Sequence, residues 1–141
     1  MFATQGHASA LEARRRELKM SRAALARISG VSMPTVFRLL SAPAALENAS
    51  LRSILAIAKA LGMAIRFDPE DSVDPLRIRP KEPADVVMER EAKKKAERLV
   101  AMVQATSGLE GQAVSPATVR GMVRKTTCEL IAGSPRRIWS D

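Results

Sequence analysis

The segment from Ser21 to Leu40 constrains the fold more than any other part of the chain. Ser21 and Ser32 are favourable N-cap residues, and each precedes a short run in which the apolar residues have helical spacing. Pro34 falls in the first turn of the second run, where proline is tolerated. Gly30 stands between the two runs, where it can take the positive φ that lets two helices cross steeply. The segment therefore predicts two short helices joined by a tight turn.

The side chains of this segment divide into an inner and an outer set. The residues expected to pack the two helices together are Leu25, Ile28, Val31, Val36 and Leu39. The residues left facing outward on the second helix are Met33, Pro34, Thr35, Phe37 and Arg38. This pattern is typical of a helix-turn-helix whose second helix enters a major groove of DNA.

The elements around this segment predict a mainly α fold. Further helices are expected over residues 10–20, 51–61, 84–106 and 116–132, and a short strand over 63–67. The predicted fold is a four-helix helix-turn-helix domain with a short β-strand after it, followed by a C-terminal α-helical hairpin. We divide the chain into a flexible N-terminus (1–9), a DNA-binding domain (10–67), a linker with room for a short strand (68–83) and a helical partner-binding or dimerisation region (84–141).

The positive charge is concentrated in the first half of the chain. Residues 1–66 contain ten of the 23 Lys and Arg residues and three of the 15 Asp and Glu residues, which gives this part a net charge of +7. Residues 67–141 hold the other thirteen and twelve, a net charge of +1. A concentrated positive field indicates a polyanion partner such as duplex nucleic acid. The alternative is a solvated basic surface.

Composition excludes several other classes of function. The chain has one Cys and one His, too few for a zinc site, so no metal and no other cofactor is expected. It has no Gly-rich phosphate loop and no Ser/His pair on expected helices or strands, which argues against an enzyme. No apolar run approaches about 20 residues, so we expect no membrane span and a cytoplasmic location.

The helical segments also carry a family resemblance. Four features of the sequence occur at the spacing that is typical of one protein family. They are the cap and Leu-Ala of SRAALA, the turn GVS, the apolar pair Val36 and Leu39, and the closing helix SLRSILAIAKALG. Residues 11–67 resemble the Xre/Cro family of helix-turn-helix proteins. Arg22 stands where that family usually has Gln.

The resemblance implies roles for single residues. Arg22 reaches a phosphate at the start of the first motif helix, and Arg38 is a candidate for bidentate binding to guanine O6 and N7. Met33 and Pro34 touch bases only through apolar contact, such as a thymine methyl. Phe37 either joins this set or packs inward or against a partner chain. The DNA-binding set predicted in this way is Arg22, Ser32, Met33, Pro34, Thr35, Phe37, Arg38 and Ser41.

Two further segments are candidates for protein contacts. The strand Met63–Phe67 can pair with its copy in a second chain or with residues 76–79 in a hairpin. Trp139 lies beside two arginines near the chain end and is expected either at an interface or docked on its own helical hairpin. The predicted partner or dimer interface consists of Met63, Ile65, Phe67, Ile138 and Trp139.

The ending LGMAIRF resembles that of Xre-type antitoxins, which dimerise through such strands, repress their own operons and bind a toxin with a second surface. The sequence therefore predicts a repressor that binds operator DNA as a homodimer and is the antitoxin of a type II toxin–antitoxin pair. Its expected partners are duplex DNA, a second copy and a protein toxin, with no membrane. The alternatives are a stand-alone Xre-family regulator and a helical interaction protein that does not bind DNA.

Overall fold

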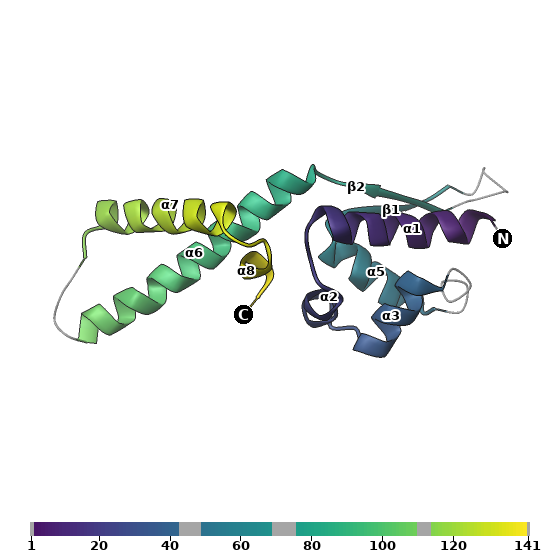
Figure 1. Cartoon of the computed structure of the whole chain (residues 1–141), viewed down its shortest axis with the longest axis horizontal. Helices are drawn as coiled ribbons and strands as arrows, with labels where there is room; N and C mark the ends of the chain where they lie inside the picture. The colour runs from purple at the N-terminus through teal and green to yellow at the C-terminus, as the bar shows by residue number, and fades with distance from the viewer. Residues whose placement is uncertain (1, 43–48, 69–75, 110–113, 141) are drawn as a thin grey trace. The chain divides into compact units, whose positions relative to one another are not determined.

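The computed structural model describes residues 2–42, 49–68, 76–109 and 114–140, and the chain divides into two compact units, Met1–Ala84 and Asp85–Asp141. The elements of the first unit are α1 (Phe2–Glu17), α2 (Arg22–Ser29), α3 (Met33–Ser41), α5 (Leu51–Ala60), β1 (Met63–Phe67) and β2 (Leu76–Pro80) (Figure 1). They are followed by α6 (Ala84–Leu109), α7 (Pro116–Ala132) and α8 (Arg136–Trp139). Within the described ranges, no helix is both long and apolar enough to cross a membrane.

Serine side chains cap the N-termini of three of these helices. The hydroxyl oxygens of Ser21, Ser50 and Ser115 accept hydrogen bonds from backbone N–H groups three residues later, at 3.0, 3.2 and 3.3 Å. Gly30 ends α2 with a φ of 73°, and its N–H donates to the Ala26 carbonyl at 2.9 Å. The tight turn between α2 and α3 is therefore confirmed.

The core of the first unit lies between its helices. α2 contacts α3 and α5, while α1 contacts α3 and β2, and α5 contacts β1. Burying one aliphatic side chain of this kind stabilises a fold by about 1.5–3 kcal/mol. The largest fully buried side chains are Leu11, Leu18, Met20, Leu25, Val36, Leu39, Ile57 and Leu61.

The strand after α5 pairs within the chain. β1 and β2 form an antiparallel hairpin in which Met63 lies opposite Pro80 and Ile65 opposite Ile78. Of the two pairings that the sequence left open, the structure shows the one with residues 76–79. Much of the chain between the predicted helices and strands falls on residues 43–48, 69–75 and 110–113, which lie outside the described ranges.

The N-terminal segment differs from the prediction. α1 begins at Phe2, and Ala8 is 3% exposed, so residues 2–9 are helical and do not form the loose end expected from their lack of an apolar period. Arg14 on the same helix is buried. Its Nε donates to the Leu61 carbonyl at 3.1 Å and its Nη2 to the Glu82 carbonyl at 2.7 Å. It therefore joins α1 to the end of α5 and to the segment after β2.

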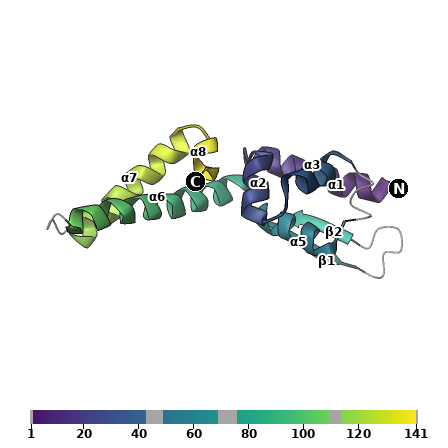
Figure 2. The same cartoon turned by 90° about the horizontal axis from the view of Figure 1, so that it is seen from below.

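In the second unit α6 and α7 run beside each other in both views, and α8 contacts α7 (Figures 1 and 2). Val87, Ala92, Ala96 and Val100 form the buried face of α6. Leu99 and Val103 on the same helix are exposed. The residues that close the core of this unit are Leu130, Ile138 and Trp139.

The burial of Ile138 and Trp139 corrects their predicted place at a partner interface. Each is 5% exposed, so both pack inside the second unit. Lys95 secures the same chain end: its Nζ donates to the carbonyl and the hydroxyl of Ser140 at 2.9 and 2.8 Å, and also to the Arg137 carbonyl. A lysine ammonium satisfies carbonyls at the end of α8, where cations are favoured.

Candidate nucleic-acid interface

The outer face of α3 brings together most of the predicted DNA-binding residues. Val36, Leu39 and Leu40 are buried, which fixes the rotation of the helix about its axis. Thr35 is half-buried, at the border between the two faces. The predicted residues exposed on or beside this helix are Ser32, Met33, Pro34, Phe37, Arg38 and Ser41. Met33, Phe37 and Ser41 form one row at four-residue spacing, and Pro34 and Arg38 form the adjacent row. With Ser32 beside them, these residues make one continuous surface.

The beginning of α3 differs in detail from the expected cap. Ser32 has the extended backbone of an N-cap residue, but its side chain makes no bond to a backbone N–H group of the helix. Its hydroxyl instead pairs with the Thr35 hydroxyl at 2.8 Å. Both hydroxyls lie at the end of α3 where the positive pole of the helix dipole favours an anion.

Arg22 connects α2 to the exposed face of α3. Its guanidinium carbon lies 4.7 Å from the centroid of the Phe37 ring, a cation–π contact. Its Nη2 donates to a Glu12 carboxylate oxygen at 3.5 Å. Phe37 is 44% exposed, so it does not pack inward, which was one of the two places that the sequence allowed.

Glu12 on α1 is the anionic centre of a cluster of arginines. Arg15 donates to its two carboxylate oxygens at 2.6 and 2.9 Å, and Arg16 approaches at 3.3 Å. The Arg15 hydrogen bond, aided by the charges of Arg15, Arg22 and Arg16, lowers the pKa of Glu12 below its usual 4.5 against the effect of burial. The same hydrogen bond raises the pKa of Arg15. Glu12 is therefore ionised at neutral pH and holds Arg22 electrostatically.

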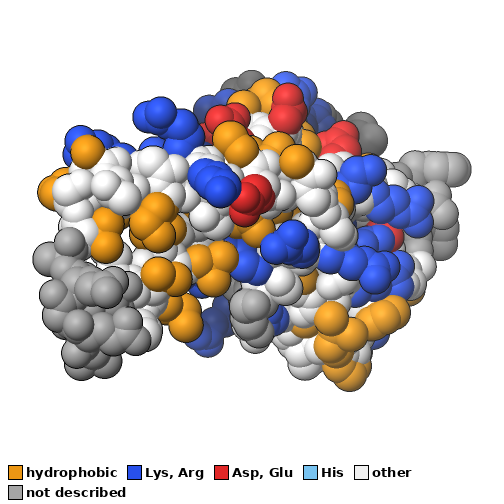
Figure 3. Space-filling model, turned by 60° about the vertical axis from the view of Figure 1, so that its left-hand side comes forward, with side chains coloured by type: hydrophobic (Ala, Val, Ile, Leu, Met, Phe, Trp, Pro, Cys, Tyr) orange, Lys and Arg blue, Asp and Glu red, His pale blue; other side chains and the backbone are white. Residues whose placement is uncertain are grey.

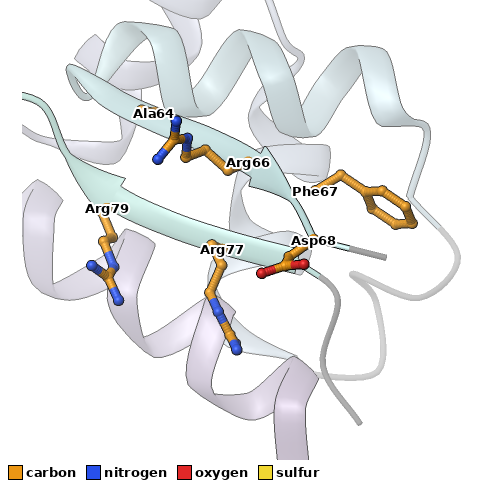
Figure 4. Close-up of a pocket in the computed structure, with 6 residues that line it drawn as sticks. All are labelled: Ala64, Arg66, Phe67, Asp68, Arg77 and Arg79. Atoms are coloured by element: carbon orange, nitrogen blue, oxygen red, sulfur yellow. The ribbon is translucent and has the colours of Figure 1, made fainter. Parts of the chain in front are cut away.

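A second basic surface lies on the β-hairpin and was not predicted. Arg66 lies opposite Arg77 in the register and Arg79 opposite Ala64, so the three arginines share one face of the sheet. With Asp68 and Phe67 they line a pocket of about 400 Å³ (Figure 4). The signal in the sequence was the alternation of arginine with apolar residues in LRIR and AIRF.

This hairpin surface does not extend the α3 surface. In Figure 1 the hairpin and α3 lie on opposite sides of the first unit, with α1 and α5 between them. Lys and Arg side chains also cover more of the face drawn in Figure 3 than Asp and Glu side chains do. Positive charge is thus widespread, and the α3 surface is distinguished by its apolar residues and its helix geometry, not by charge alone.

The structure does not bring the predicted partner-interface residues together on one surface. In the hairpin, Met63 is buried, Ile65 is half-buried and Phe67 is 71% exposed. Ile138 and Trp139 belong to the core of the other unit. Sequence reasoning missed a different apolar surface, on α6, where Leu99, Met102 and Val103 are exposed at three- and four-residue spacing.

Comparisons with known proteins bear on the first unit. Residues 11–67, less than half of the chain, match a protein family described as helix-turn-helix. The matched range covers α2 and α3 with their flanking elements, from Leu11 in α1 to Phe67 at the end of β1. Neither the curated proteins nor the solved structures gave a match to this chain.

Proposed function

We propose that this chain, which carries an Xre/Cro-type helix-turn-helix domain at residues 11–67, is a transcriptional repressor that binds operator DNA in a sequence-specific way. A domain of this type implies a DNA-binding transcriptional regulator. The observation that supports the proposal is the exposed face of α3, which carries Arg38 and Met33. A recognition helix of this kind reads base edges when it enters the major groove.

The exposed residues divide into those that position the protein and those that read bases. Arg38 can form a bidentate hydrogen bond with guanine O6 and N7, the commonest specific contact in the major groove. Arg22, at the start of α2, lies where a phosphate approaches the positive end of that helix. Phosphate contacts fix the register of the protein on the duplex, and base contacts specify the sequence.

Arg38→Ala is expected to lower the discrimination between a selected duplex and random DNA by about 1–3 kcal/mol, because one bidentate base contact is lost. The measurement is binding of the full-length chain to a duplex selected from a random pool, across a salt series. Arg79→Ala is the matched control, since it removes one exposed positive charge on β2, a strand that lies away from α3 (Figure 1).

The two variants give separate outcomes. Arg79→Ala should weaken binding to the selected duplex and to random duplexes equally and only slightly, because it removes one positive charge from the general attraction to phosphates. Equal loss of discrimination in both variants would show that α3 does not read bases through Arg38. Absence of duplex binding at low salt would remove the DNA-binding proposal and leave a helical interaction protein.

We further propose that the protein is the antitoxin of a type II pair, acts as a homodimer and neutralises a protein toxin through its C-terminal region. Two observations support a protein partner there. Residues 67–141 are almost neutral in net charge, and Leu99, Met102 and Val103 expose apolar side chains on α6. Apolar surface of this kind is favourable at protein interfaces.

Co-expression tests the antitoxin proposal. A small neighbouring gene should be toxic alone and harmless when this chain is present. Met102→Glu places a charge on the exposed face of α6, where Met102 is 68% exposed, and is expected to abolish neutralisation while duplex binding is kept. Neutralisation by Met102→Glu and by a chain lacking residues 84–141 would contradict the proposal and favour a stand-alone regulator.

A further inference from the structure

An apolar strip runs along the outer face of α3. Met33 and Phe37 are 39% and 44% exposed and lie one helical turn apart, with exposed Pro34 beside them. We name these three residues the apolar strip. The buried face of the same helix is already complete with Val36, Leu39 and Leu40. The strip is therefore only partly covered by the rest of the chain, and its exposed apolar area is open to a partner.

Phe37 is held in place from a second helix. The Arg22 guanidinium lies 4.7 Å from the ring centroid, and Arg22 is itself drawn by the ionised Glu12. A cation over one ring face restricts the ring, so its remaining exposed part is presented in a fixed direction. Arg22 thus has a positioning role toward Phe37 in addition to any contact with a phosphate.

The major groove offers one apolar group to such a strip. Base edges there carry hydrogen-bond donors and acceptors, and thymine alone among the four bases adds a C5-methyl group. Pro34 and Phe37 have no side-chain donor or acceptor for the other edges, and Met33 has only a weakly accepting thioether sulfur. Burial of a methyl group against such side chains is favourable, by about fourfold in affinity for each one.

We infer that the apolar strip reads thymine C5-methyl groups in the operator, with Phe37 as the principal reader and Arg22 as its positioning residue. This inference rests on the proposed function, since it requires α3 to enter the major groove. It adds the class of base recognised: an operator half-site with thymine opposite the first turn and a half of α3, beside the guanine expected for Arg38.

Deoxyuridine substitution is the test, because deoxyuridine lacks the thymine methyl and keeps the Watson–Crick edge. The probe is a duplex selected from a random pool by the full-length chain, with each thymine replaced in turn. At one or two positions we expect a loss of affinity of about fourfold. Thymines outside the stretch of duplex that the bound protein protects from cleavage are the internal control, and their replacement should cause no loss of affinity.

Protein variants connect this loss to particular residues. In Phe37→Ala the affinity for the thymine duplex falls. At one position, replacing thymine with deoxyuridine then causes no further loss of affinity, so the deoxyuridine penalty disappears there. Because Phe37 is exposed, the variant is expected to keep the fold, and circular dichroism checks this. Arg22→Gln should reduce the penalty as well, whereas a role limited to phosphate contact would leave the penalty unchanged and overturn the positioning part.

The outcomes separate the inference from the function beneath it. Specific duplex binding with no deoxyuridine penalty at any position would overturn methyl reading and leave the repressor proposal standing. A selected duplex without thymine in the protected region would do the same. Absence of any duplex binding would overturn the repressor proposal itself.

Discussion

Arg14→Met is expected to lower the free energy of unfolding of the first unit by about 3 kcal/mol, because it removes hydrogen bonds from one buried and one part-buried carbonyl group. The Arg14 side chain is 2% exposed, and its guanidinium serves the carbonyls of Leu61 and Glu82 and the carboxylate of Glu17. Methionine keeps most of the apolar stem and removes only the donors. The Leu61 carbonyl then loses its donor in a buried place and the Glu82 carbonyl in a part-buried one.

Thermal unfolding followed by circular dichroism measures this loss. In a unit of this size, about 3 kcal/mol corresponds to a decrease in melting temperature of about 12–24 °C. Trp139 is the one tryptophan of the sequence and lies in the second unit, so its fluorescence reports on that unit separately. We expect the fluorescence transition to stay in place while the main helical transition moves down.

Arg16→Met is the matched control on the same helix. Its side chain is 73% exposed and pairs with Glu12 at 3.3 Å, and exposed ion pairs contribute only about 0–1 kcal/mol. A similar loss in both variants would contradict the structural role of Arg14 and return it to the general positive surface. A large loss of stability in Arg14→Met alone supports the role of Arg14 as the connection between α1, α5 and the segment after β2.

Arg14 also illustrates what local sequence patterns leave undetermined. It stands in a run of three arginines, and its acceptors, Leu61 and Glu82, lie 47 and 68 residues away in the sequence. No periodicity or cap signal carries that information, because the pairing exists only after α5 and β2 have packed on α1. Lys95 was missed for the same reason: its acceptors at Arg137 and Ser140 are 42 and 45 residues away.

The helix-turn-helix itself was predictable because its determinants are local. Ser21 caps α2, Gly30 takes its positive φ, and Val36 and Leu39 face inward, each from signals within a few residues. The helical start at Phe2 was missed because the segment has neither a cap nor an apolar period. On α6 the apolar residues are spread around the helix, so spacing alone did not tell whether Ala92 or Val103 would be buried.

Candidate-site residues followed the same division. The outward set on α3 came from helix rotation, which the buried residues of the motif determine locally. The contact between Arg22 and Phe37 joins two helices, and only the packing of α2 on α3 places the guanidinium over the ring. The assignment of Ile138 and Trp139 to an interface used residue type alone, and residue type favours a core and an interface equally.

Trp139→Ala is expected to destabilise the second unit by about 3–5 kcal/mol, the usual cost of removing a buried aromatic side chain. Trp139 is 5% exposed at the end of α8, where Lys95 holds the following carbonyl. Small units have only about 0.05–0.15 kcal/mol of stability per residue, so the loss is comparable to the whole stability of this unit. Limited proteolysis should then cleave within residues 85–141 while the first unit stays resistant.

Trp139→Phe and Met102→Ala complete this experiment. Trp139→Phe keeps an aromatic side chain in the core and should recover much of the loss, whereas Met102→Ala removes an exposed side chain and should change stability by no more than about 0.5 kcal/mol. Unchanged stability in Trp139→Ala would restore its place at an interface. A loss of toxin binding in Trp139→Ala would indicate a contact between Trp139 and the toxin only if the second unit stays folded. Met102 is exposed, so its substitution reports on the partner surface directly.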